Sequence, residues 1–216
     1  MKKLITTAAA AIALAGASAS ATVLDFANYA DTFGERGTAQ GETLTVGGVD
    51  VRLFAVDDTL MEFIDANPYL DAGNAGLGMC STGLTSAEQC VVPGDDNVTS
   101  GEGVAITFED SNFDVNGLTF RGANHALLGQ GAMVTIGTIA SDGTRDIRTD
   151  SIGAFVALAA AGDAFFSNIR GIGFGFAGDQ FYLSQMDVDA VPVPAAGLLF
   201  LTGAAGLAFK RSRAKA

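Results

Sequence analysis

Residues 42–56, ETLTVGGVDVRLFAV, decide the fold class of this 216-residue chain. Polar and apolar residues alternate on both sides of Gly47 and Gly48, and such alternation is typical of β-strands with one buried face. A Gly-Gly pair tolerates the positive φ angles of a tight turn. The stretch therefore predicts a β-hairpin and sets the expectation for the residues around it.

Similar short runs recur along the chain and predict an all-β fold. They are bounded by Gly, Asp, Asn or Ser, which favour turns. We expect further strands in TVLDFANYA (22–30), GVAITFED (103–110), FDVNGLTFRG (113–122), AMVTIGTIA (132–140), AFVALAA (154–160), IRGIGFGFAG (169–178) and QFYLSQMDVDAV (180–191). Eight or nine strands at this spacing indicate an antiparallel β-sandwich of the jelly-roll kind. The alanines of residues 151–166 could form a helix, but the flanking glycine and the phenylalanines favour a strand.

The first 21 residues predict a secretory signal peptide. Lys2 and Lys3 precede an apolar run over residues 4–15, and Ala19 and Ala21 supply the small side chains that a signal peptidase requires. Cleavage after Ala21 implies the Sec translocon and signal peptidase as partners. A retained N-terminal anchor helix is the alternative.

Residues 22–190 have the length of one domain and are strongly acidic. They contain all 24 acidic residues and six of the 12 basic ones, a net charge of −18. Such a body repels nucleic acid and anionic lipid, so we expect no nucleic-acid partner. Its carboxylates must be solvated, spread apart or neutralised by a cation.

The last 26 residues, VPVPAAGLLFLTGAAGLAFKRSRAKA (191–216), predict a membrane segment. An uncharged run over about 194–209 is a short candidate transmembrane helix, and a proline is tolerated in its first turn. The basic end, residues 210–216, predicts that the C-terminus stays inside while the body lies outside. The basic residues are Lys210, Arg211, Arg213 and Lys215. A buried C-terminal helix is the alternative.

This tail resembles the VPLPA variety of the PEP-CTERM sorting domain, which combines a Val-Pro-x-Pro-Ala box, a short transmembrane helix and a basic end. The box is formed by Val191, Pro192, Val193, Pro194 and Ala195, with Val193 where leucine is commoner. The resemblance implies an exosortase-like membrane protease of a Gram-negative bacterium as partner. It also implies transient residence in the inner membrane, removal of the tail, and delivery to the cell surface or an extracellular polysaccharide matrix.

Residues 65–102 form the longest segment without clear strand character, and long loops in compact domains are usually functional or disordered. They contain Cys80 and Cys90, the only cysteines of the chain. In an exported protein we expect a disulfide, which would contribute about 2–3 kcal/mol. Free thiols are the alternative, and a zinc site is disfavoured because the chain has a single histidine.

The same segment concentrates oxygen ligands of the kind that calcium prefers. The candidate ligands are Asp71, Asp95, Asp96, Asn97 and Glu102, with Asn74 nearby. Their spacing does not match an EF-hand loop. A type I turn over PGDDN, in which Asp and Asn bond their own backbone, is the alternative.

No catalytic constellation stands out in the sequence. His125 is the sole histidine, and no Gly-x-Ser-x-Gly motif accompanies it. The chain also lacks tryptophan, the usual platform for stacking sugars. We therefore expect a non-enzymatic structural or adhesive protein of the extracellular layer. The alternatives are a calcium-dependent carbohydrate-binding module and a secreted hydrolase that uses two of the carboxylates.

Overall fold

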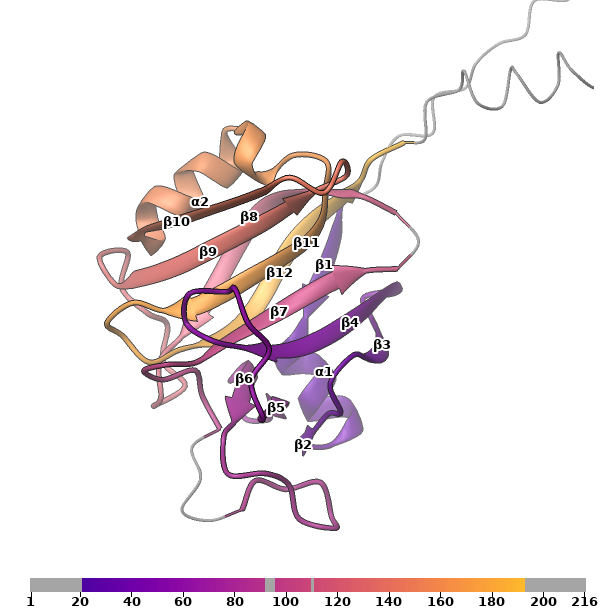
Figure 1. Cartoon of the computed structure of the whole chain (residues 1–216), viewed down its shortest axis with the longest axis vertical. Helices are drawn as coiled ribbons and strands as arrows, with labels where there is room; N and C mark the ends of the chain where they lie inside the picture. The colour runs from indigo at the N-terminus through magenta and orange to yellow at the C-terminus, as the bar shows by residue number, and fades with distance from the viewer. Residues whose placement is uncertain (1–20, 92–95, 110, 193–216) are drawn as a thin grey trace, which may run out of the picture. The chain divides into compact units, whose positions relative to one another are not determined.

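A computed structural model describes residues 21–91, 96–109 and 111–192, and this part of the chain is all-β with two short α-helices (Figure 1). Every strand pairing is antiparallel. The elements are β1 (Thr22–Asp25), α1 (Phe26–Phe33), β2 (Arg36–Gly37), β3 (Glu42–Val46), β4 (Val49–Val56), β5 (Asn67–Asp71), β6 (Gly76–Cys80), β7 (Gly103–Phe108), β8 (Phe113–Arg121), β9 (Met133–Ala140), β10 (Arg145–Ser151), α2 (Ile152–Ala160), a 3₁₀ turn (Ala164–Phe166), β11 (Ile169–Phe176) and β12 (Tyr182–Ala190). The expectation of an all-β fold is confirmed.

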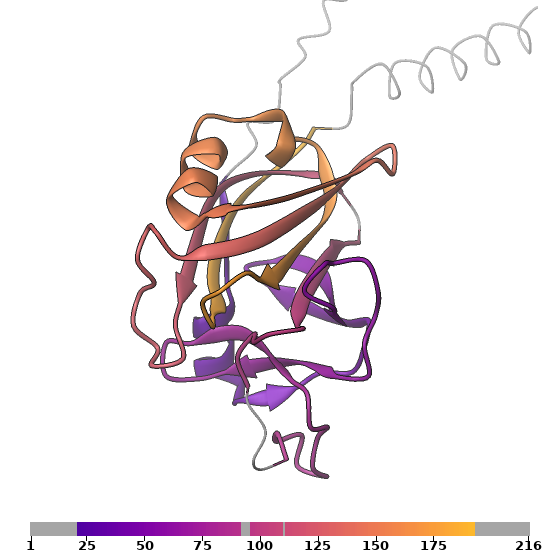
Figure 2. The same cartoon turned by 60° about the vertical axis from the view of Figure 1, so that its left-hand side comes forward.

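The strands form one sheet that curls (Figure 2). In one half, β11 pairs with β7 and β9, and the half continues through β4 and β3 on one side and β10 on the other. In the other half, β12 pairs with β8, β1 and β6, followed by β5 and β2. The halves join between β8 and β11, where the pairing is reduced to Ile169 opposite Phe113.

The hairpin expected in residues 42–56 is confirmed. Val46 lies opposite Val49, and Gly47 and Gly48 turn the chain with φ angles of 59° and 83°. Alternate side chains of β4, including Val51, are completely buried. The hairpin thus delivers one apolar face to the core.

One hydrophobic core lies between the two halves of the curled sheet. Phe120 of β8 contacts Phe174 of β11 edge to face, with ring centroids 5.6 Å apart. Phe181 also contacts Phe120 edge to face, with ring centroids 5.5 Å apart. Phe155 of α2 belongs to the same buried cluster. These contacts join strands that do not pair along their length.

Two stretches expected as strands contain helices, and capping is the physical reason. β1 ends at Asp25, whose side chain accepts the N–H of Asn28 and so begins α1. Ser151 accepts the N–H of Ala154 in the same way and begins α2. The buried residues of α2 recur at helical spacing, so the expectation of a strand at 154–160 was wrong.

Other strands were missed. The segment 65–102 contains β5 and β6, and β6 is buried at every position, so it lacks the alternation that identifies a strand. The opposite holds for β10, a charged strand whose residues are exposed from Arg145 to Asp150. Neither pattern carries a period-two signal.

Several predicted features lie outside the described residues. They are the signal peptide with Ala19, the box residues Val193, Pro194 and Ala195, the helix at 194–209, and the basic residues Lys210, Arg211, Arg213 and Lys215. In the described part, the backbone N–H of Val191 still bonds the carbonyl of Asn112 at 2.9 Å. Among the described helices, none has the length and apolar character needed to cross a membrane.

Candidate functional site: an acidic cluster

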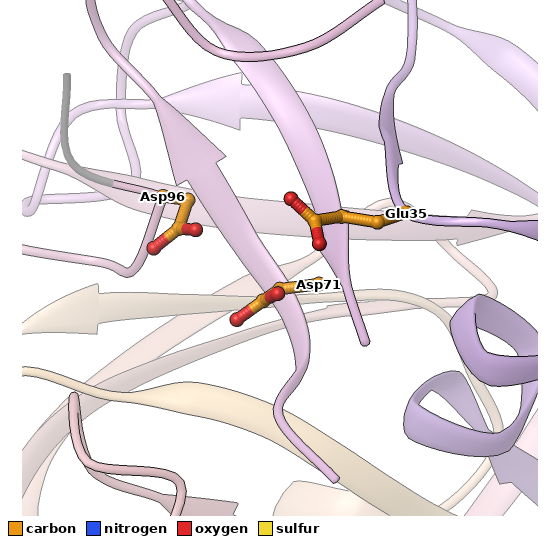
Figure 3. A group of neighbouring side chains, drawn as sticks. All are labelled: Glu35, Asp71 and Asp96. Atoms are coloured by element: carbon orange, nitrogen blue, oxygen red, sulfur yellow. The ribbon is translucent and has the colours of Figure 1, made fainter. Parts of the chain in front are cut away.

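Three carboxylates from separate parts of the chain converge at one end of the fold. Glu35, Asp71 and Asp96 each place an oxygen within 4.8 Å of the others, and Figure 3 shows the three groups facing a common space. Glu35 is exposed, Asp96 is half-buried and Asp71 is buried. Three negative charges at this separation repel one another unless protons or a cation neutralise them.

The strand pairings explain why these residues meet. Asp71 is the last residue of β5, and the preceding Leu70 lies opposite Arg36 of β2. The residue before Arg36, Glu35, therefore lies beside the end of β5, close to Asp71. Asp96 is positioned through its backbone, because its carbonyl accepts the N–H of Met79 in β6 at 2.9 Å.

A glycine permits the close approach of the Asp96 segment to β6. A Cβ on Gly78 would lie 2.1 Å from the Asp96 carbonyl oxygen and 2.8 Å from the ring of Tyr182. No side chain fits at that distance, so Gly78 allows Asp96 to lie against the sheet.

Two buried tyrosines donate hydrogen bonds to the cluster. Tyr69 donates to Glu35 Oε1 at 2.6 Å, and Tyr182 donates to Asp96 Oδ1. Burial raises the pKa of the Tyr69 hydroxyl, and its bond to Glu35 raises it further. Burial and the bond to Asp96 raise the pKa of Tyr182 in the same way. Both hydroxyls therefore remain protonated donors at neutral pH.

Asp71 is the most shielded carboxylate of the three, with 5% of its surface exposed. Burial raises its pKa to about 6, the charge of Asp96 adds to the rise, and His125 opposes it. Asp71 Oδ2 accepts no hydrogen bond of regular geometry from the described residues, although it lies 3.0 Å from His125 Nε2.

The ring of His125 lies between the Gly73 carbonyl and the Asp71 carboxylate. His125 Nδ1 is 3.1 Å from the carbonyl oxygen of Gly73, which only accepts, so Nδ1 carries a hydrogen. Nε2, on the other side of the ring, lies 3.0 Å from Asp71 Oδ2, so the two ring nitrogens contact the Gly73 carbonyl and the Asp71 carboxylate. The ring also packs edge to face on Tyr182, with centroids 5.5 Å apart.

The structure brings together only part of the calcium set expected from sequence. Asp71 and Asp96 meet, whereas the carboxylate of Glu102 accepts bonds from the backbone and hydroxyl of Thr99 at 2.8 and 2.7 Å. Asn97 is buried, Asn74 lies in the turn between β5 and β6, and Asp95 lies outside the described residues. Glu35 was missed, because only the pairing of β2 with β5 brings it near Asp71.

The expected disulfide between Cys80 and Cys90 is confirmed. It joins the end of β6 to the loop that follows. This loop borders the acidic cluster, since Gln89 Nε2 donates to the carbonyl of Glu35 at 2.7 Å. The disulfide thus holds one side of the cluster in place.

Comparison with known proteins adds no relative from which a function could be transferred. No family model matches the chain, and neither the curated proteins nor the solved structures contain a match.

Proposed function

We propose that this protein is exported and serves as a non-enzymatic structural or adhesive component of the cell surface or extracellular matrix. The disulfide between Cys80 and Cys90 is the observation that carries this proposal, because such bonds persist in oxidising compartments outside the cytosol. Residues 1–21 resemble a secretory leader and residues 191–216 resemble a sorting tail, and the net charge of −18 on residues 22–190 suits a solvated extracellular body. In this proposal an exosortase-like protease removes the tail.

The environment of His125 supports the non-enzymatic part of the proposal. Its two ring nitrogens contact Gly73 and Asp71, so within the described structure the imidazole is not directed at a serine or cysteine nucleophile. A secreted hydrolase that uses the carboxylates remains the alternative. A panel of glycan and ester substrates tests it: turnover that disappears in Asp96→Asn would replace the structural proposal.

Cell fractionation with mass spectrometry of the mature termini tests the sorting route. We expect a chain that begins near Thr22, ends close to the Pro192 box and is found at the surface or in the matrix. A cytosolic chain with both termini uncut would contradict the proposal, and an intact C-terminus in the inner membrane would contradict its processing step.

The acidic cluster favours a second candidate function, calcium-dependent binding of an extracellular polysaccharide. Glu35, Asp71 and Asp96 supply the hard oxygen ligands that Ca²⁺ prefers, and a divalent ion would relieve their mutual repulsion. The two tyrosines orient the carboxylates that they bond.

Titration calorimetry with CaCl₂ tests whether calcium binds to the carboxylates that the fold brings together, and whether Glu102, expected as a ligand from the sequence, takes part. We expect Asp96→Asn to abolish the calcium heat and Glu102→Gln to keep it, because Glu102 is bonded to Thr99. Polysaccharide is then titrated with and without calcium. No calcium heat in the unaltered protein would exclude this candidate and leave the structural role.

A further inference from the structure

Three glycines of β11 lie on one face of the sheet. Gly171, Gly173 and Gly175 alternate with Ile172 and Phe174, whose side chains are buried in the core. Because successive residues of a strand point to opposite faces, β11 presents no side chain between Gly171 and Gly175 on the face that points away from the core.

Neighbouring strands extend this gap sideways. Gly173 lies opposite Ala105 of β7 and Gly137 of β9, which in turn lie opposite Phe54 of β4 and Ile147 of β10. This row has small residues in its middle and large apolar residues at both ends. The result is a depression along β11, called here the β11 trough, with Phe54 and Ile147 as its walls.

The loop after β4 closes one end of the β11 trough and crosses in front of β7 in Figure 1. The carbonyl oxygen of Asp58 lies over Gly175, and a Cβ there would be 2.3 Å away from it. The side chain of Leu60 lies over Gly137 and Gly173. The Leu60 backbone has a φ of 60°, a conformation that leucine rarely adopts.

Leu60 fills only part of the β11 trough. A cavity of 260 Å³ remains, and Phe54, Phe63, Ile139 and Ile147 are among the residues that line it. Phe63 is 72% exposed and Met61, also a lining residue, is 60% exposed. Large apolar side chains thus gather around a space that the fold leaves open.

The guanidinium of Arg145 lies at the end of the β11 trough opposite Asp58. Arg145 lines the cavity and lies opposite Ile139, which lies opposite Gly171. Its guanidinium forms no ion pair or hydrogen bond with the described residues, although the body carries a net charge of −18. The acidic lining residue Glu62 belongs to the loop at the other side.

We propose that the β11 trough binds a medium-chain fatty acid, with the acyl chain over the glycines and the carboxylate on Arg145. A mostly apolar cavity with one polar group that fixes orientation is the usual form of a small-molecule site. At about 30 Å³ for each heavy atom, the cavity volume corresponds to roughly nine atoms, the number of carbons that decanoate carries beyond its carboxylate. An unpaired guanidinium selects an anionic head group by a charge-assisted hydrogen bond.

Titration calorimetry of the purified protein with decanoate tests this site. We expect saturable binding of one decanoate, and at least tenfold weaker binding of decyltrimethylammonium, which has the same chain and the opposite charge. Acetate should not bind, because it lacks the chain. Arg145→Gln should weaken decanoate about tenfold or more, as expected for the loss of a hydrogen bond to a charged group, and should leave decanol unaffected.

Two further variants complete the test. Ile147→Asp places a charge in the exposed wall of the trough and should weaken both decanoate and decanol. Arg148→Gln is the matched control, because Arg148 lies on the opposite face of β10, over the ring of Phe165 at 4.4 Å, and should bind decanoate normally. No saturable binding of decanoate, or equal affinity in all three variants, would overturn the proposal.

Discussion

Asp71 makes the stability of the domain depend on pH. Its pKa of about 6 lies above the value of 3.8 for a free aspartate, so the folded state binds a proton more tightly than the unfolded state between these values. The free energy of unfolding should therefore fall as pH rises from 4 to 6. We expect Asp71→Asn to raise it by about 1–3 kcal/mol at pH 7 and to change it little at pH 4.

Urea denaturation at the two pH values measures this effect. Asp65→Asn is the control, because Asp65 is exposed and forms no ion pair in the described structure. An Asp71→Asn protein that is less stable than the unaltered protein at pH 7 would show that the carboxylate has a partner that offsets its burial. Calcium is left out of these measurements.

At the scale of single residues, the sequence correctly predicted the features that depend on the residues themselves or on few possible partners. The Gly47-Gly48 turn requires only its own φ angles, and Cys80 and Cys90 had no other cysteine to pair with. Glu35 and Arg145 gave no such signal, since distant strands bring them to their sites. The alternating glycines of IRGIGFGF are a local pattern that indicates the bare face of β11, but strand order alone shows what lies above it.

The start of α2 depends on a single hydroxyl. Ser151 Oγ accepts the N–H of Ala154 at 3.3 Å, and an unsatisfied N–H at a helix end costs free energy. We expect Ser151→Ala to lower the free energy of unfolding by about 1 kcal/mol. Ser151→Asp keeps an acceptor at the N-cap and should retain most of the stability in urea denaturation. Equal stability of the two variants would contradict the capping argument.

The disulfide should support its loop rather than the whole sheet. Replacing both Cys80 and Cys90 by serine frees a chain segment of ten residues' separation, and we expect a loss of about 2–3 kcal/mol in urea denaturation. The tyrosine signal in near-UV circular dichroism should persist, because the core strands do not depend on the loop. Complete unfolding of the double variant in buffer would contradict this expectation.

The sequence predicted strands correctly where polar and apolar residues alternate clearly. The prediction failed where a helix cap or complete burial of a strand determined the secondary structure. β4 and β8 alternate and were expected correctly. Residues 26–33 and 152–160 became helices because Asp25 and Ser151 cap them. β6 is buried on both faces and therefore looked like part of a loop.

The charge of the whole body should make its stability sensitive to salt. A net charge of −18 on residues 22–190 destabilises the folded state by self-repulsion. Raising KCl from about 0.01 M to about 1 M shortens the Debye length from about 30 Å to about 3 Å. The melting temperature in circular dichroism should rise with this change, equally in NaCl. A constant or falling melting temperature would show that the acidic groups are already spaced or paired.

Fold class followed from sequence, but strand order did not. The pairing of β1 with β12 joins Thr22 to Val188, and β4 pairs with β7 rather than with the β5 that follows it. Such non-local pairings depend on the packing of the complete core. A sequence with many similar short strands gives no separate signal for them.

The pairing of β1 with β12 also places the start and the end of the domain next to each other. Thr22 and Val188 are neighbours, so the chain enters and leaves at the same edge. Tyr182, which bonds the acidic cluster, lies eight residues before Ala190 along β12, a distance of about 26 Å. Glu35, Asp71 and Asp96 are therefore presented at the end of the domain that lies far from the edge where the chain enters and leaves, which keeps the acidic cluster accessible whatever adjoins that edge.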